Sequence, residues 1–253
     1  MPNYISATQI LMYLRCPLQY FYRYIRGIKS QPGGTMTLGS TVHSTFKENY
    51  TQKIESHQDL STPKLQEFFA SEFEKQAPFT EWAVDEKPGE FKDGGVEIIR
   101  AYQSVVAPIT QPLMVEQRWT VEIKDVPIPL LVILDLIDSE NRIRDHKVSS
   151  KTPNQMIVAQ SIQLSLYSLA YRLATGKTES SVGLDYMIRN KKNEVTINRM
   201  QGARSIQDLD RAVKLTKSVA AAISKQVFFP CNPEEWCCSE KWCGWFHLCH
   251  KEW

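Results

Sequence analysis

The strongest constraint on the fold is an apolar run from Ile128 to Ile137 that carries a single charged residue, Asp135. The run is too short to cross a bilayer as a helix. A continuous apolar run of this length instead suits a strand that is buried on both faces of a sheet. The segments around it, Met114 to Ile123 and Arg142 to Val148, also have the pattern of strands. The sequence therefore predicts a packed sheet with this segment at its centre.

The rest of the chain alternates between helical and extended patterns. A Ser N-cap predicts a helix from Ser6 to about Gly27 that turns Ile10, Leu11, Leu14 and Leu18 inward and Tyr13, Tyr20, Arg23, Tyr24 and Arg26 outward. Further helices are predicted over Gly39 to about Lys53, within Glu55 to Ala107 apart from a loop over Phe79 to Gly95, and over Ile157 to Ala174 and Ile206 to about Gln226. Two more strands are expected at Val182 to Ile188 and Glu194 to Met200. This order predicts an α/β fold with a central mixed sheet flanked by helices.

Charge is unevenly distributed along the chain. The formal net charge of +2 says little about partners, but no acidic residue precedes Glu48. The basic residues of that stretch are Arg15, Arg23, Arg26, Lys29 and Lys47. A basic region of this kind suits a polyanionic partner.

Two carboxylates and a lysine fall on neighbouring predicted strands. Asp135 lies near the end of the apolar strand, and Asp145 and Lys147 share one face of the next strand. Two carboxylates on an apolar sheet repel each other unless a cation lies between them, and Mg²⁺ or Mn²⁺ is commonly held in this way. A nearby lysine suits metal-assisted phosphodiester hydrolysis. The alternative is a solvated hairpin end, where Asp and Lys are common.

Three other residues add to this set. His43, on an earlier predicted helix, is a possible further metal ligand, although an ordinary core or surface histidine is the alternative. Gln163 and Tyr167 lie one helical turn apart, so they share one face of the helix that follows the third strand. Both are candidates for contacting DNA or a catalytic water.

The ordered set of motifs resembles the RecB-like branch of the PD-(D/E)XK nucleases, which includes AddB-type domains, CRISPR-associated RecB-like nucleases and phage exonucleases. The motifs are Gly39 to His43, Asp135, Asp145 to Lys147, Gln163 to Tyr167, the opening helix around Cys16, and the closing cysteines. The resemblance implies a restriction-endonuclease-like core. It divides one integrated domain into a helical region at 1–110, a nuclease core at 111–227 and a Cys-rich tail at 228–253 that a metal cluster closes.

The resemblance also assigns roles to individual residues. It implies that His43, Asp135, Asp145 and the main-chain carbonyl of His146 bind Mg²⁺ or Mn²⁺. It makes Asp135, Asp145 and Lys147 catalytic. Gln163 and Tyr167 would contact the substrate, and Glu116 would contact the metal or one of its ligands, unless it is an exposed strand residue.

The six cysteines need a reason other than disulfides, because no signal peptide is evident and a cytoplasmic protein keeps its thiols reduced. Cys238, Cys243 and Cys249 are separated by four and five residues, and the resemblance places Cys16 beside them. It implies that these four bind a [4Fe–4S] cluster, with zinc as the alternative that spacing alone leaves open. Cys237 could replace Cys238, and His247 or His250 could replace a thiolate. Cys231 is expected to have no ligand role.

Tyr20, Tyr24 and Arg23 are candidates for stacking on bases and binding phosphates, with packing around the cluster as the alternative for the tyrosines. Arg189, Lys191 and Lys192 form a basic turn that could follow a DNA backbone or simply be solvated.

The expected function is a metal-dependent DNA exonuclease. Its substrate would be single-stranded DNA or DNA ends, in repair, recombination, phage DNA metabolism or CRISPR adaptation, with a helicase or integrase as a possible partner and no membrane. The alternatives are a non-catalytic iron–sulfur scaffold that binds DNA and a zinc-stabilised protein of unrelated function.

Overall fold

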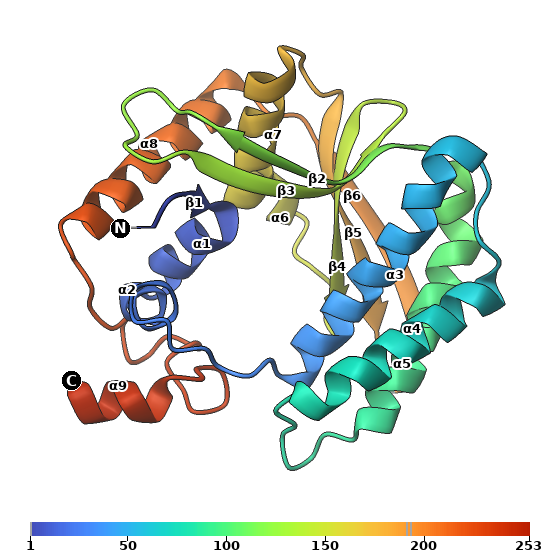
Figure 1. Ribbon diagram of the computed structural model, residues 1–253, viewed down its shortest axis with the longest axis horizontal. Helices are drawn as coiled ribbons and strands as arrows, with labels where there is room; N and C mark the ends of the chain where they lie inside the picture. Colours follow the sequence, from blue (N-terminus) through green and yellow to red (C-terminus); the bar gives the residue numbers. More distant parts are fainter. Residues whose placement is uncertain (1, 191, 193) are drawn as a thin grey trace.

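A computed structural model describes residues 2–190, 192 and 194–253, and a mixed sheet lies at its centre (Figure 1). The strands are β1 (Ile5–Ser6), β2 (Pro112–Val121), β3 (Leu130–Asp138), β4 (Arg142–Ser149), β5 (Ser181–Arg189) and β6 (Val195–Gly202). Their order is β1-β3-β4-β5-β6, and β2 pairs with β3 off this path. The pairs β1·β3 and β4·β5 are parallel, and the other pairs are antiparallel. The predicted mixed sheet is confirmed.

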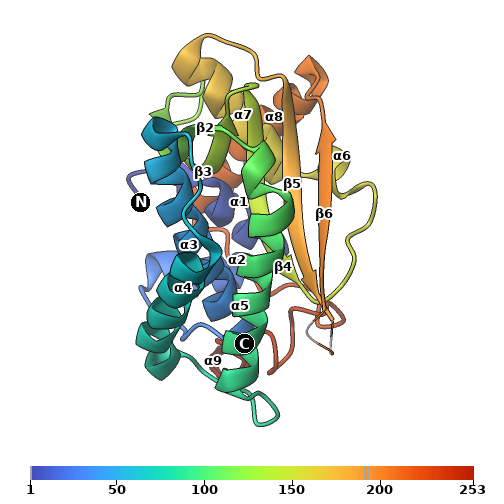
Figure 2. The same ribbon diagram turned by 90° about the vertical axis from the view of Figure 1, so that its right-hand side faces the viewer.

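Helices cover both faces of the sheet, as Figures 1 and 2 show. On one face lie α1 (Ala7–Arg15), α6 (Ile157–Gln160), α7 (Ile162–Thr175) and α8 (Ile206–Ser224); on the other lie α3 (Gly34–Ser56), α4 (Thr62–Gln76) and α5 (Pro88–Val105). Each face has its own hydrophobic core. The central strand serves both, because Leu134 belongs to the first core and Leu136 to the second. Burial of β3 on two sides explains why its sequence is almost continuously apolar.

The first predicted helix is broken at Cys16. Ser6 caps α1 as expected, since its Oγ accepts a hydrogen bond from the Gln9 N–H at 3.2 Å. Cys16 is extended because the ring of Pro17 disfavours the helical region for the residue before it. The chain then continues as α2 (Pro17–Tyr20) and a π-helix (Phe21–Ile25).

The break also changes which residues of this segment are buried. Ile10 and Leu18 are buried as expected, but Leu11 and Leu14 are exposed, whereas Tyr13 and Tyr20 belong to the core. The prediction of the inward face was therefore half wrong. One continuous helical period cannot describe two short helices that meet at an extended residue.

Other boundaries also differ from the prediction. α3 begins at Gly34 rather than Gly39, and α5 begins at Pro88, inside the expected loop. The helix expected from Ile157 is interrupted at Ser161, whose side chain caps α7. Strand β1 and the closing helix α9 (Phe246–Glu252) were not predicted. The proline at the start of α5, the Ser161 cap and the pairing of β1 with distant β3 account for three of these differences.

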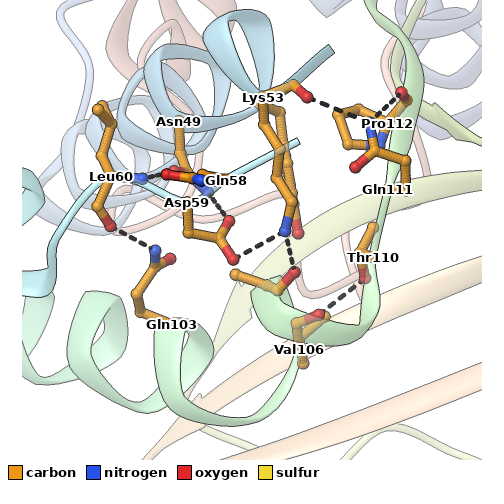
Figure 3. Close-up of polar contacts among 12 residues, drawn as sticks. Asn49, Lys53, Gln58, Asp59, Leu60, Gln103, Val106, Thr110, Gln111 and Pro112 are labelled. Carbon is orange, nitrogen blue, oxygen red and sulfur yellow. Dashed lines mark hydrogen bonds and ion pairs between the residues drawn. The ribbon is translucent and has the colours of Figure 1, made fainter. Parts of the chain in front are cut away.

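A buried polar network holds the end of α3 against the start of the sheet (Figure 3). Lys53 Nζ, 5% exposed, donates to Asp59 Oδ2 and to the carbonyl of Ala107, both at 2.7 Å. Asn49 donates to the other oxygen of Asp59 at 2.8 Å and accepts from the Leu60 N–H. The network therefore fixes the turn after α3 and the short helix before β2 in one arrangement.

The segment that follows α1 lies against the Cys-rich tail. The Leu18 N–H donates to the Phe229 carbonyl at 3.0 Å, and Trp245 Nε1 donates to the Ile28 carbonyl at 3.0 Å. Arg26 pairs with Glu252 at 2.6 Å. These contacts bring Cys16 close to the cysteines of the tail. None of the helices in the described ranges has both the length and the apolar composition needed to cross a membrane.

Candidate active site

Three acidic side chains lie in one row across three neighbouring strands. Val115 and Gln117 pair with Leu136 and Leu134, so the register of β2 and β3 places Glu116 beside Asp135. Between β3 and β4, which are antiparallel, Leu136 pairs with Arg144, so Asp135, one residue earlier in β3, lies beside Asp145, one residue later in β4. Strand pairing alone thus gathers carboxylates that are up to 29 positions apart in the chain.

Asp145 and Lys147 form the end of this row that lies on β4. Lys147 Nζ lies 2.7 Å from Asp145 Oδ2, and both side chains lie on the same face of β4, as predicted. Asp145 is only 1% exposed, and its Oδ2 lacks a hydrogen bond of good geometry among the described residues. The lysine side chain is 34% exposed, so its ammonium can reach solvent or a substrate.

Asp135 is held between two histidines. Its Oδ2 accepts the main-chain N–H of His146 at 2.8 Å and lies 3.3 Å from His43 Nδ1. The other ring nitrogen of His43, Nε2, lies 2.8 Å from the main-chain carbonyl oxygen of His146. His43 comes from α3, on the opposite side of the site from α7, so helices from both faces of the sheet meet at these acids.

The two aspartates have opposite pKa shifts. Burial alone would raise the pKa of Asp135, but His43 and His146 lower it to about 2. Burial and the Asp135 charge raise the pKa of Asp145 to about 6, against the effect of Lys147. Burial alone would lower the pKa of His43, but Asp135 and Asp145 raise it to about 9. The two carboxylates therefore favour positive charge beside them, and the raised pKa of His43 follows from the same preference.

The donor set fits Mg²⁺ or Mn²⁺. These ions prefer carboxylate and carbonyl oxygens, and Mn²⁺ also accepts imidazole. Ligand atoms of His43, Asp135 and His146 lie within 4.8 Å of one another. The His146 carbonyl is a better donor than its ring, because the ring is 2% exposed and its Nε2 bonds with Tyr102 at 2.9 Å. The buried Oδ2 of Asp145, which Lys147 approaches without forming a well-aligned hydrogen bond, supplies a further oxygen.

Gln163 and Tyr167 close the other side of the site. Gln163 Nε2 donates to Asp145 Oδ1 at 3.3 Å and to the Tyr167 hydroxyl at 2.7 Å. Tyr167 is 6% exposed, and burial together with Asp145 raises the pKa of its hydroxyl. The pair is therefore placed against the acids.

Glu116 has an unusual backbone. Its φ is 49°, in the left-handed region that side chains other than glycine seldom adopt. Burial and the neighbouring Asp135 raise the pKa of its carboxyl group. A strained residue of this kind beside two acids suggests a functional constraint on its orientation.

The residues expected to bind DNA are divided by their burial. Tyr20 is fully buried and stacks on Phe228, with ring centroids 6.2 Å apart, so it has no free face for a base. We therefore assign Tyr20 to packing and correct that expectation. Tyr24 is partly exposed, with the exposed Arg23 guanidinium 5.6 Å from its ring centroid. These two residues remain candidates.

The predicted basic turn after β5 is only partly available. Arg189 donates to the Glu90 carbonyl at 2.6 Å and lies over Phe91, so its guanidinium is already engaged. Lys192 is exposed, and Lys191 lies outside the described residues. The turn gives little support for a DNA contact.

All six cysteines line one small cavity between α2 and the tail: Cys16, Cys231, Cys237, Cys238, Cys243 and Cys249. All are free thiols. Burial, followed by neighbouring thiols, raises the pKa of Cys249. Six thiols around one cavity form a donor set that suits a thiophilic metal or cluster.

Cys231 and Cys237 are closer to this group than expected. Their Sγ atoms lie 3.8 Å apart, and Cys237 is 2% exposed. Cys231, for which no ligand role was expected, is therefore in the same cavity, as is His250. A turn between Cys231 and Cys237 brings them together, and no spacing rule in the sequence indicates such a contact.

Several residues of the site environment were not singled out from the sequence. Tyr102, Asp185 and Arg144 lie behind β4 and reach the site through His146. A signal was present in β4, where Arg144 and His146 alternate with Asp145 and Lys147. Such a strand has polar residues on both faces, so a polar partner is required on the far face as well.

Comparisons with known proteins bear on the family and the fold. Residues 4–250 match the sequence model of the PD-(D/E)XK nuclease superfamily. A search of the curated proteins found no significant match. Among solved structures, a proposed exonuclease from Eubacterium rectale superposes with a TM-score of 0.62 at 14% identity, over 93% of this chain and 87% of its own. The structure of SSO0001 superposes with a TM-score of 0.47 at 13% identity, over 100% of this chain and 88% of its own.

Proposed function

The chain belongs to the PD-(D/E)XK nuclease superfamily, with the restriction-endonuclease-like fold, and from this premise we propose that it is a Mg²⁺- or Mn²⁺-dependent DNA exonuclease. One observation carries the proposal most strongly. His43, Asp135, Asp145 and Lys147 come from three separate elements and meet at one place. A structural role explains one buried ion pair, but it gives no reason to place two carboxylates side by side in an apolar sheet.

We assign the metal ligands to Asp135, Asp145, His43 and the carbonyl oxygen of His146. A bound divalent ion supplies Lewis-acid polarisation of the phosphate and lowers the pKa of a water molecule. The chain fixes the orientation of these donors. The His146 N–H holds Asp135, and Gln163 and Lys147 hold the two oxygens of Asp145.

We assign to Lys147 the role of the catalytic lysine. Its ammonium is held by Asp145 at 2.7 Å and is partly exposed. Burial alone would lower the pKa of Lys147, but Asp145 raises it. A lysine that stays protonated stabilises developing charge on the phosphate and orients the attacking water.

Substrate contacts are assigned to Gln163, Tyr167, Tyr24 and Arg23. Gln163 and Tyr167 lie at the acids themselves. Tyr24 and Arg23 present a ring and a guanidinium at the partly exposed end of the π-helix. An aromatic ring beside a cation suits single-stranded DNA, whose bases are free to stack. Glu116 is assigned a supporting contact with the metal or with Asp135.

The test compares cleavage of four DNA substrates by anaerobically purified protein with Mg²⁺ or Mn²⁺. The substrates are end-labelled linear and circular DNA, each single- and double-stranded. We expect linear single strands and duplex ends to be degraded and circles to be spared. Cleavage of circles would replace the exonuclease assignment with an endonuclease.

The matched variants are Asp145→Ala and Lys147→Ala at the site, and Asp125→Ala and Lys217→Ala at an exposed ion pair of 3.0 Å elsewhere. We expect cleavage to be lost in the first pair and retained in the second. Metal-independent DNA binding without cleavage by the wild type would instead support a scaffold that binds DNA. The pathway and a helicase or integrase partner are to be sought by co-purification.

We also propose that Cys16, Cys238, Cys243 and Cys249 hold a [4Fe–4S] cluster. Support comes from the common cavity, in which Cys16 and Cys238 both influence the pKa of Cys249. A brown protein with broad absorption at roughly 400 nm and bound iron and sulfide is expected. Colourless protein with stoichiometric zinc would contradict it. Serine variants of Cys238 and Cys237, compared side by side, test which of these neighbours is the ligand.

A further inference from the structure

The side chain of His146 belongs to a buried polar chain that extends away from the acids. The imidazole lies on the opposite face of β4 from Asp145 and Lys147. Phe46 and Tyr102 flank it at ring-centroid distances of 5.0 and 5.5 Å, and Tyr50 stacks on it at 6.3 Å. The ring is thus confined on several sides by aromatic groups from α3 and α5.

Polar contacts continue this confinement to the far side of the sheet. Tyr102 Oη lies 2.9 Å from His146 Nε2 and 3.5 Å from Asp185 Oδ2. Asp185 pairs with His146 in the register of β4 and β5. It forms ion pairs with Arg144 and with Arg199, the latter at 3.1 Å. The chain therefore joins β4, β5, β6, α3 and α5 through one histidine.

The main chain of the same histidine lies inside the active site. Its N–H donates to Asp135 Oδ2, and its carbonyl lies 2.8 Å from His43 Nε2. His146 Nδ1 is also 3.6 Å from the same Asp135 oxygen. A rotation of this residue would therefore shift a carboxylate and a carbonyl that the proposed function assigns to the metal.

A contribution of the ion pairs to stability does not explain this buried polar chain of side chains. Asp185 is fully buried and Arg144 is 2% exposed, and a buried ion pair of this kind seldom adds net stability relative to apolar residues. Arg144 also requires Gly183 opposite it, because a Cβ there would clash with the guanidinium and with the main-chain oxygen of Met200. A network with these requirements is well suited to fixing one orientation of the residue at its end.

We propose that Tyr102 is a positioning residue for the metal site and acts through His146. This inference rests on the proposed function. In a neutral imidazole only one nitrogen carries a hydrogen. If Nδ1–H faces Asp135, then Nε2 accepts from the Tyr102 hydroxyl, and the ring links the carboxylate to the buried chain.

The test is Tyr102→Phe, which removes one hydroxyl and keeps the aromatic packing. We expect the dissociation constant for Mn²⁺, measured by titration calorimetry or electron paramagnetic resonance without DNA, to rise about ten-fold or more. We also expect the Mn²⁺ concentration for half-maximal cleavage to rise, with kcat at saturating Mn²⁺ largely retained. The Mn²⁺ resonance should broaden or split differently, because the ligand geometry becomes less uniform.

The matched control is Tyr50→Phe. Tyr50 is 1% exposed and donates to Tyr102 Oη at 3.1 Å, so this variant removes an equally buried hydroxyl one step farther from His146. We expect its Mn²⁺ affinity to equal that of the wild type. Equal Mn²⁺ affinity in Tyr102→Phe and the wild type, with only a lower unfolding temperature, would overturn the positioning role. Failure of the wild type itself to bind Mn²⁺ would overturn the proposed function as well.

Discussion

Two groups of charged residues in the interior of this protein differ in how their charges are paired. At the end of α3, Lys53 and Asp59 are paired at 2.7 Å, and their remaining polar atoms are bonded to Asn49 and the Ala107 carbonyl. At the centre of the sheet, Asp135 and Asp145 lie side by side, and Asp145 Oδ2 lacks a well-formed hydrogen bond among the described residues. The first group is saturated and balanced, whereas the second combines like charges.

The difference distinguishes a group that stabilises the fold from one that serves chemistry. A network in which every polar atom has a hydrogen-bond partner contributes to stability and leaves no atom free to bind a ligand. Two neighbouring carboxylates with pKa values displaced in opposite directions are characteristic of a functional site, and the one with the raised pKa, Asp145, costs stability at neutral pH. The following predictions separate the two groups by experiment.

The largest effect is expected for Asp145→Asn, which should lower DNA cleavage by about 1,000-fold because it removes the charge of a proposed metal ligand. In buffer with a chelator at pH 8, the free energy of unfolding of this variant should exceed that of the wild type by about 1 kcal/mol. The sign follows from a folded-state pKa of about 6 against an ordinary 3.8. The stability linked to Asp145 is fully present below pH 3.8 and is lost as the pH rises through about 6. Reduced stability together with normal cleavage would mean that Asp145 stabilises the fold and has no part in catalysis.

Lys53→Met should lower stability without lowering DNA cleavage. It leaves the Asp59 carboxylate and the Ala107 carbonyl without their donor, so the free energy of unfolding should fall by about 2–4 kcal/mol. Cleavage by the folded variant, measured well below its melting temperature, should be unchanged. The control is Lys75→Met, which breaks an exposed ion pair of 2.6 Å with Glu72. That variant should lose less than about 1 kcal/mol.

The pH dependence of metal binding should report the acid site alone. Metal must displace the proton of His43, whose pKa is about 9, and below about pH 6 also that of Asp145. Mn²⁺ affinity should therefore rise about ten-fold per pH unit between about pH 6 and about pH 9. The rise should be steeper below about pH 6, and the affinity should level off above about pH 9. Calorimetric titrations at several pH values measure this slope. A flat profile would mean that neither group binds the ion.

The smallest effect is expected for Glu116→Gln. Its carboxyl group lies beside Asp135 but at the edge of the row, so we expect cleavage to fall about three-fold. Glu122→Gln, an exposed residue just after β2, is the matched control and should have no effect. A loss as large as that of Asp145→Asn would make Glu116 a full metal ligand.

Local patterns predicted most of the fold. The strands from β2 to β6 and the helices α7 and α8 follow from alternation, apolar runs and caps, all of which are set by neighbours in the chain. The break at Cys16, the start of α5 at Pro88 and strand β1 were not predicted. In these places proline geometry or pairing with distant β3 decides the conformation.

The site was predicted as residue types rather than as an arrangement. Asp135, Asp145 and Lys147 could be placed on adjacent strands because their spacing fixes the face of each strand. The register that aligns Glu116, Asp135 and Asp145 depends on pairing between strands, and so does the contact of His146 with Asp185. The role of Tyr20 was misassigned because a single sequence does not indicate which aromatic face a broken helix buries.

The contact of Trp245 with the Ile28 carbonyl spans 217 positions. During synthesis on the ribosome, the segment after α1 must therefore remain without these partners until almost the whole tail has emerged. The buried rings of that segment, Tyr20 and Tyr22, stay open to solvent and to chaperones for this period. Acquisition of any metal by Cys16 and the tail cysteines is consequently a late event in the biogenesis of the protein.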